Sequence, residues 1–131
     1  MNCYANACFK HLNVMNKQEL LDKLFKFSVS IVLLVNKLPK SPAGYAISNQ
    51  IVRSGTSITA NCEEAQDAIS KKDFIKSITI ALKEAKETKY WLRLLLESKM
   101  STDKQINSLL DECSQIIAIL VKSVKTLKGK T

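Results

Sequence analysis

Basic residues that could bind phosphate groups concentrate in the second half of this chain. The candidates are Lys72, Lys76, Lys83, Lys86, Lys89, Arg93, Lys122, Lys125 and Lys128. The spacing of the first four places several lysines near one side of a helix. By contrast, residues 41–70 contain a single basic residue, Arg53. Lysine–phosphate contacts depend on salt but not on base sequence, so the pattern predicts a surface for RNA or DNA. A solvated face is the alternative for any one lysine.

A second group of residues has the types expected of a buried polar network in a helical bundle. Its members are Arg53, Asn61, Glu64, Lys83, Glu84 and Glu87. Charged residues beside an apolar face are rarely buried unless they are paired, which favours a structural network. The alternative is a ligand pocket in the core.

Two neighbouring aromatic residues, Tyr90 and Trp91, precede Arg93 and could stack on nucleic-acid bases. Proteins that bind single strands generally use several aromatics along one groove. We therefore favour a structural role, at the end of a bundle or at a subunit interface.

No pattern of an active site or a metal centre is visible. Cys3, Cys8 and His11 match no common zinc spacing and lack a fourth ligand nearby. His11 is the only histidine, so neither a Glu-x-x-His di-iron site nor a nucleophile with a histidine base can be built. The three glycines stand apart and form no phosphate-binding loop. We expect a non-enzymatic protein with no catalytic residues, metal or cofactor.

The length and composition indicate one helical domain. The chain has 131 residues, few glycines and prolines, and a net charge of +8, which favours polyanions or an acidic protein surface as partners. A basic protein that is merely soluble is the alternative. Cys62 and Cys113 lie on apolar helical faces, as in reduced cytoplasmic proteins. We see no signal peptide, and the longest apolar run, 29–35, is too short to span a membrane.

Four helices are predicted from caps and apolar spacing. The first covers about 17–37 after an Asn16–Glu19 capping box, and the second covers about 42–69 with Ser41 as its cap. A Ser70 cap begins the third, which ends near Ser98. The fourth begins at Thr102 with Gln105 and ends near Gly129. Short connections make sequential helices antiparallel neighbours.

The apolar faces of these helices complete the predicted architecture. In the first helix the apolar face comprises Leu20, Leu21, Leu24, Phe25, Ser28, Ile31, Val32 and Val35. In the second, apolar residues from Ile47 to Ile69 flank small residues that allow close helix approach, such as Ser54 and Gly55. We predict an all-α, antiparallel up-down-up-down four-helix bundle over 16–131. Residues 1–15 would be a frayed extension, with Met1 or Met15 as the start.

A set of motifs in their order resembles a known family. The motif residues are Gln50, Arg53, Ser54-Gly55, Ser57-Ile58, Asn61, Glu64-Ala65, Lys72-Asp73-Phe74, Ala81-Leu82, Lys83-Glu84-Ala85, Glu87-Thr88 and Trp91-Leu92. Together they closely resemble the 23S rRNA intervening-sequence proteins, also called the S23 family, over about 18–124. Many members have Glu-Gly where this chain has Glu64-Ala65, a difference that concerns the local helix.

The resemblance implies a fold and a class of function. Family members are small bacterial four-helix bundles, some encoded inside insertions in 23S rRNA genes. They are similar to the accessory variability protein of diversity-generating retroelements, a pentamer that binds nucleic acid and works with a reverse transcriptase. The resemblance thus implies a homopentamer that binds RNA or DNA, and no catalytic residues. The alternative is a protein-interaction scaffold or accessory subunit, for example of a reverse transcriptase, without direct nucleic-acid recognition.

Overall fold

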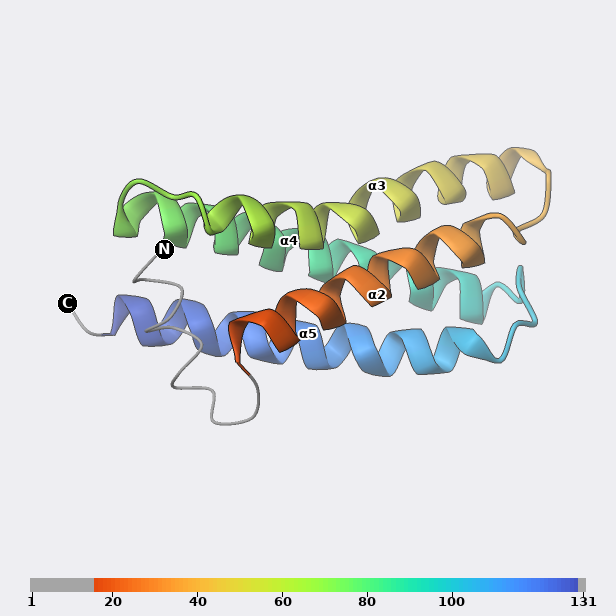
Figure 1. The fold of residues 1–131 in the computed structure, drawn as a ribbon. Coiled ribbons are helices and arrows are strands. Elements are labelled where there is room, and N and C mark those ends of the chain that lie inside the picture. The colour runs from red at the N-terminus through yellow and green to blue at the C-terminus, as the bar shows by residue number, and fades with distance from the viewer. Residues whose placement is uncertain (1–15, 130–131) are drawn as a thin grey trace.

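The computed structural model describes residues 16–129, which contain four helices and no strand. The helices are α2 (Lys17–Val35), α3 (Pro42–Ala65), α4 (Lys71–Glu97) and α5 (Gln105–Lys128). Sequential helices run antiparallel, and Figure 1 shows them side by side in one bundle. Helix α3 packs on α2 and α4, α4 packs on α5, and α2 touches α5 only slightly. This confirms the predicted all-α four-helix bundle. The predicted extension, with Cys3, Cys8 and His11, lies outside the described residues.

The predicted caps of the first three helices are present. The side chain of Asn16 accepts a hydrogen bond from the Glu19 backbone N–H at 2.8 Å, and the Glu19 carboxylate accepts one from the Asn16 backbone N–H. Ser41 and Ser70 cap α3 and α4 in the same way, each through its hydroxyl oxygen at 3.1 Å. These side chains satisfy backbone donors that have no partner within the helix, and so fix where each helix begins.

Three predicted helix boundaries were wrong. Helix α3 ends at Ala65, not near Ile69, because the chain must become extended at Ser70 to cap α4. Ile69 is accordingly 92% exposed rather than part of the core. Helix α2 ends at Val35, and the turn that follows leads to Leu38-Pro39. Thr102 does not cap α5, whose cap residue makes no side-chain hydrogen bond.

The core face of α2 differs in part from the predicted one. Its buried residues are Leu20, Leu24, Phe27, Ile31 and Leu34. Phe25 and Val32, predicted to be inside, are 59% and 40% exposed. The reason is that α2 is apolar on more than one side, so the sequence allowed two overlapping faces and only one of them meets α3 and α5.

Small and hydroxyl-bearing residues of α3 join it closely to its neighbours. The Thr59 hydroxyl lies 2.7 Å from that of Ser28 and donates to the Leu24 carbonyl oxygen of α2. On the other side of α3, the Thr88 hydroxyl of α4 donates to that of Ser54 at 2.9 Å. All these groups are hydrogen-bonded, so α3 can be partly polar inside without unsatisfied hydroxyls.

Candidate nucleic-acid interface

Five basic residues form a continuous exposed row along α4. They are Lys72, Lys76, Lys83, Lys86 and Arg93, which follow one another at steps of four, seven, three and seven residues. The buried residues of α4, from Phe74 to Leu95, point toward the rest of the bundle, so this row faces away from the core. We call it the α4 ridge. It is roughly 31 Å long, from the rise of 1.5 Å per residue.

Lys89 lies off this ridge. It is half-buried, and its charge acts on the Cys113 thiol of α5, which places it on the side of α4 that meets α5. The exposed aromatic Tyr90 lies on the ridge, between Lys86 and Arg93 in sequence. Lys89 was one of the binding residues predicted from the sequence, and the structure separates it from the ridge residues.

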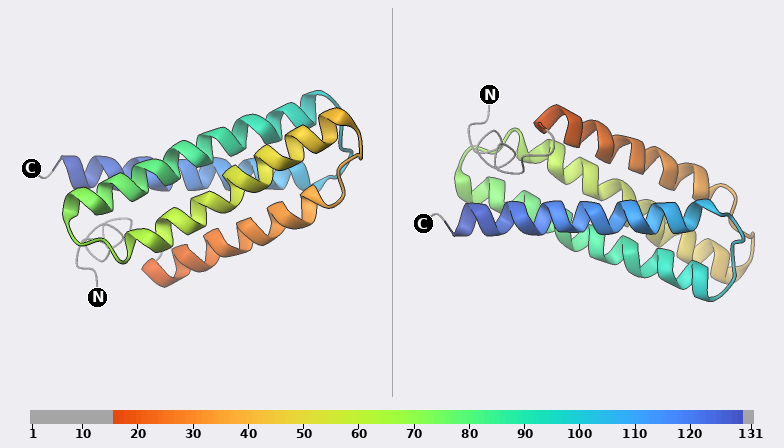
Figure 2. Two further views of the ribbon diagram at one scale, coloured as in Figure 1. Left: turned by 90° about the horizontal axis from the view of Figure 1, so that it is seen from above. Right: turned by 90° about the horizontal axis from the view of Figure 1, so that it is seen from below.

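The lysines of α5 gather at the end of that helix. Lys122, Lys125 and Lys128 are all exposed, and the last two occupy the final turn, where positive charge offsets the negative end of the helix dipole. Because α4 and α5 are antiparallel, this end lies beside the first turns of α4 (Figures 1 and 2). The α5 end, as we call these three lysines, therefore lies at the same end of the bundle as Lys72 of the α4 ridge.

Part of the predicted polar network is present, but at the surface. The Arg53 guanidinium of α3 donates to the carboxylates of Glu84, at 3.1 Å, and Glu87 on α4. The Trp91 indole N–H also donates to Glu87, at 3.1 Å. The Arg53 side chain is 47% exposed, so the network is not buried as predicted. Full burial of a guanidinium is costly, and this position leaves it in contact with water.

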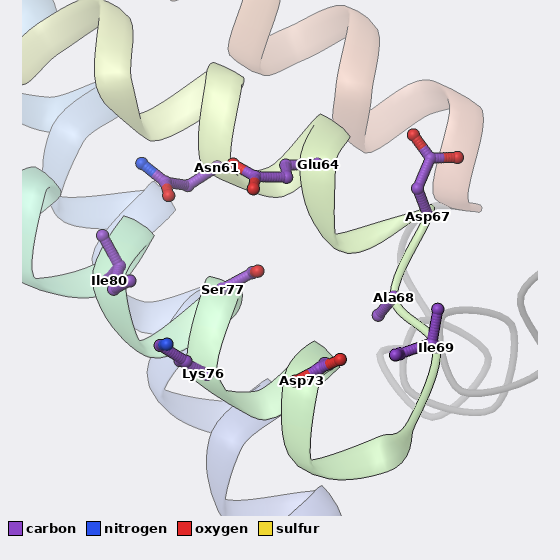
Figure 3. A pocket seen from close by; sticks show the side chains of 9 residues that line it. All are labelled: Asn61, Glu64, Asp67, Ala68, Ile69, Asp73, Lys76, Ser77 and Ile80. Atoms are coloured by element: carbon purple, nitrogen blue, oxygen red, sulfur yellow. The ribbon is translucent and has the colours of Figure 1, made fainter.

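The other predicted members of the network lie elsewhere. The Asn61 side chain donates to the Ser57 carbonyl oxygen within α3, Glu64 is exposed, and Lys83 belongs to the α4 ridge. Asn61 and Glu64 line a hollow of about 520 Å³ where α3 meets α4 (Figure 3). That hollow also holds two aspartates and a single lysine, so its carboxylates disfavour a phosphate ligand.

Nothing in the described residues has the geometry of an active site. Burial raises the pKa of the Cys113 thiol to about 12, and the thiol donates to the Ala85 carbonyl oxygen at 3.2 Å. A thiol held in its neutral form is a poor nucleophile. Residues 16–129 contain no group of three histidine, cysteine or acidic side chains placed to hold a metal. Nor is any of these four helices long and apolar enough to cross a bilayer.

Comparison with known proteins identifies the family of this fold. The sequence profile of the 23S rRNA-intervening sequence proteins matches residues 16–122. A crystal structure of a protein of unknown function from the S23 ribosomal protein family of Bacteroides thetaiotaomicron is similar, with a TM-score of 0.77 and 41% sequence identity. The match covers 85% of this chain and 99% of that one. A comparison with functionally curated proteins gave no match. The chain therefore belongs to the family of 23S rRNA-intervening sequence proteins.

Proposed function

We propose that this protein is a non-enzymatic, oligomeric helical bundle that binds RNA or DNA through the α4 ridge and the α5 end. The observation that carries the proposal is the exposure of the ridge residues, in one row, on the side of α4 opposite the core. The ion pairs within residues 16–129 use Lys37 and Arg53, and none of them involves a residue of the ridge. Phosphates would relieve the mutual repulsion of the ridge charges.

Salt dependence of binding tests this proposal. A fluorescently labelled rRNA hairpin is titrated with the protein at several salt concentrations, and binding is followed by anisotropy. We plot the logarithm of the association constant against the logarithm of the salt concentration. If the five ridge residues each neutralise one phosphate, this plot should be a line with a slope of about −4 to −5. No binding at 50 mM salt would overturn the proposal.

Substitutions then locate the surface. The double variant Lys83→Gln, Lys86→Gln removes two charges from the middle of the α4 ridge and should reduce the slope by about two. The matched control is Lys26→Gln, which removes an exposed lysine from α2. This control should bind with nearly unchanged affinity and slope. An equal loss for each charge removed in the two variants would mean that binding follows net charge alone and would contradict a localised interface.

The oligomeric part of the proposal is supported by an apolar surface on α2. Phe25, Val29, Val32 and Leu33 are all at least 40% exposed on one side of this helix. Three of them border a shallow groove with Thr56 of α3. Exposed apolar side chains that cluster in this way mark association surfaces. We propose that copies of the chain associate here, as a homopentamer by resemblance to the accessory variability protein.

Light scattering tests this association. The wild-type protein should have the mass of a homo-oligomer, and the variant Phe25→Ser, Val29→Ser should be shifted toward a monomer. Tyr45→Ser, an exposed apolar residue at the start of α3, is the control and should leave the mass unchanged. A monomeric wild-type protein at micromolar concentration would contradict the proposal.

The same α2 surface favours a second candidate, an accessory subunit for another protein such as a reverse transcriptase. In this case the α2 surface would hold the partner, and nucleic acid would not be contacted directly. A pull-down with the product of a neighbouring reverse-transcriptase gene, where the genome has one, tests this candidate. Retention of the partner by the Lys83→Gln, Lys86→Gln variant, with no nucleic-acid binding by the wild type, would favour it over the first.

A further inference from the structure

We infer that the ligand of the α4 ridge is double-stranded, and that the ridge contacts the phosphate backbones of a duplex rather than the bases of a single strand. This inference rests on the proposed function and specifies its ligand. It follows from three features of the basic surface: its convex shape, its shortage of aromatic side chains and the spacing of its charges.

The α4 ridge is convex. Its residues are the part of α4 farthest from the core face, and α4 is a single unbroken helix over Lys71–Glu97. Of the hollows described in the structure, the one between α3 and α4 reaches the ridge only at Lys76, and the others lie between α2 and α5 and between α2 and α3. Single strands are usually held in a groove that tracks the backbone and receives the bases. A duplex, by contrast, already stacks its bases inside and presents phosphates outside, so a convex row of lysines can reach them.

Aromatic platforms are scarce on this surface. Tyr90 is 55% exposed and is the one aromatic of the ridge, whereas the half-buried Trp91 donates a hydrogen bond to Glu87 on the same helix, which pairs with Arg53 of α3. Phe74 is fully buried. Stacking of successive bases contributes about 1–3 kcal/mol per base in single-strand binding and needs several such rings. A ridge with one exposed ring cannot replace the stacking that the bases lose when a duplex opens.

The charges of the ridge are grouped. Lys72 and Lys76 form one group, and Lys83 and Lys86 form the next. The interval from Lys76 to Lys83 is about 10 Å along the helix, as is that from Lys86 to Arg93. These intervals are comparable to the width of a duplex groove, about 12 Å for the major groove of B-DNA. Successive groups can therefore contact the two backbones that flank a groove, an arrangement that a single strand does not offer.

The test compares ligands of matched sequence. Anisotropy titrations at 100 mM salt use a 20-nucleotide single-stranded RNA without self-complementarity, the same RNA in a duplex, and a DNA duplex of the same sequence. Both duplexes should bind at least about tenfold more tightly than the single strand, because two backbones increase the number of phosphates in reach. Tighter binding of one of the two duplexes would show whether the double-stranded ligand is RNA or DNA, and either result agrees with the inference.

Two variants make the test specific. Lys83→Gln, Lys86→Gln should weaken duplex binding by about tenfold or more, and Tyr90→Ala should change it by less than about twofold. Circular dichroism is used to check that both variants are folded. Equal or tighter binding of the single strand, or a loss of more than tenfold in Tyr90→Ala, would overturn the inference while leaving the proposed function standing. Absence of binding to all three ligands, even at 50 mM salt, would instead overturn the proposed function itself.

Discussion

The turn between α2 and α3 provides a sharp test of the packing described here, through the substitution Gly44→Ala. Gly44 is buried in the first turn of α3 and its backbone N–H donates to the Ser41 hydroxyl oxygen. A methyl group at this position would overlap the Pro39 carbonyl oxygen and approach the Pro39 carbonyl carbon to 2.9 Å. These are backbone atoms, so the overlap can be relieved only if the turn opens.

The size of the effect follows from what the open turn loses. Loss of the Ser41 cap costs about 1 kcal/mol. Exposure of Leu38, which is 6% exposed in the fold, costs about 1.5–3 kcal/mol. Alanine has a higher helix propensity than glycine, which raises the free energy of unfolding by about 1 kcal/mol. The free energy of unfolding of the variant should therefore be about 1.5–3 kcal/mol below that of the wild type, which corresponds to a decrease in Tm of roughly 5–10 °C.

Urea denaturation followed by circular dichroism at 222 nm measures this difference, with both proteins at the same concentration because an oligomer is stabilised by mass action. Gly129→Ala is the control, because this glycine ends α5 and, among residues 16–129, an added Cβ would contact only the Lys125 carbonyl oxygen, at 3.0 Å. We expect it to change stability by less than about 0.5 kcal/mol. A Gly44→Ala protein as stable as the wild type would show that the turn does not press against α3, and would refute this reasoning.

Three further predictions concern the helix contacts. Arg53→Ala should destabilise the fold by about 1 kcal/mol or less in urea unfolding, because the guanidinium is 47% exposed and its ion pairs are screened by water. Gly55→Ala should be destabilising because its Cβ would lie 2.9 Å from Ile31, and adding Ile31→Ala should make the double variant more stable than the sum of the single effects, as a double-mutant cycle measures. Burial raises the pKa of Cys113 from 9.0 to about 12, so its stabilising contribution is complete below pH 9 and is lost as the pH rises toward 12. Between pH 8 and 11 the urea midpoint should fall more in the wild type than in Cys113→Ala, and an equal decrease would contradict the raised pKa.

The helix starts could be predicted from the sequence because capping is local. Asn16, Ser41 and Ser70 each bond a backbone N–H three residues ahead, so the residues that decide the boundary are adjacent in the chain. The end of α3 was harder to predict, because apolar spacing continues to Ile69 while the demands of the next helix cap stop the helix at Ala65. When the next helix determines where a helix ends, the apolar periodicity of the first helix does not indicate that end.

The candidate site was predictable to a similar degree. The exposed lysines of α4 follow from helical periodicity alone, so Lys72, Lys76, Lys83 and Lys86 were correctly placed near one side. The side on which Lys89 lies depends on where α5 packs, which is a tertiary contact. The ion pairs of Arg53 also join two helices, and their exposure depends on how far the guanidinium stands from the bundle axis. The spacing of residues within one helix does not predict how far a side chain lies from the bundle axis.

The hydroxyl contacts on both sides of α3 have a consequence for changes in chain length. Ser54 meets α4 and Thr59 meets α2, so the segment between them is fastened at two points on different faces. One residue inserted there would rotate Ser54 by roughly 100° about the helix axis relative to Thr59, so that one of the two hydroxyl contacts would be lost. Natural relatives should therefore vary in length in the connections around 36–41 and 98–104, while this five-residue interval of α3 stays constant.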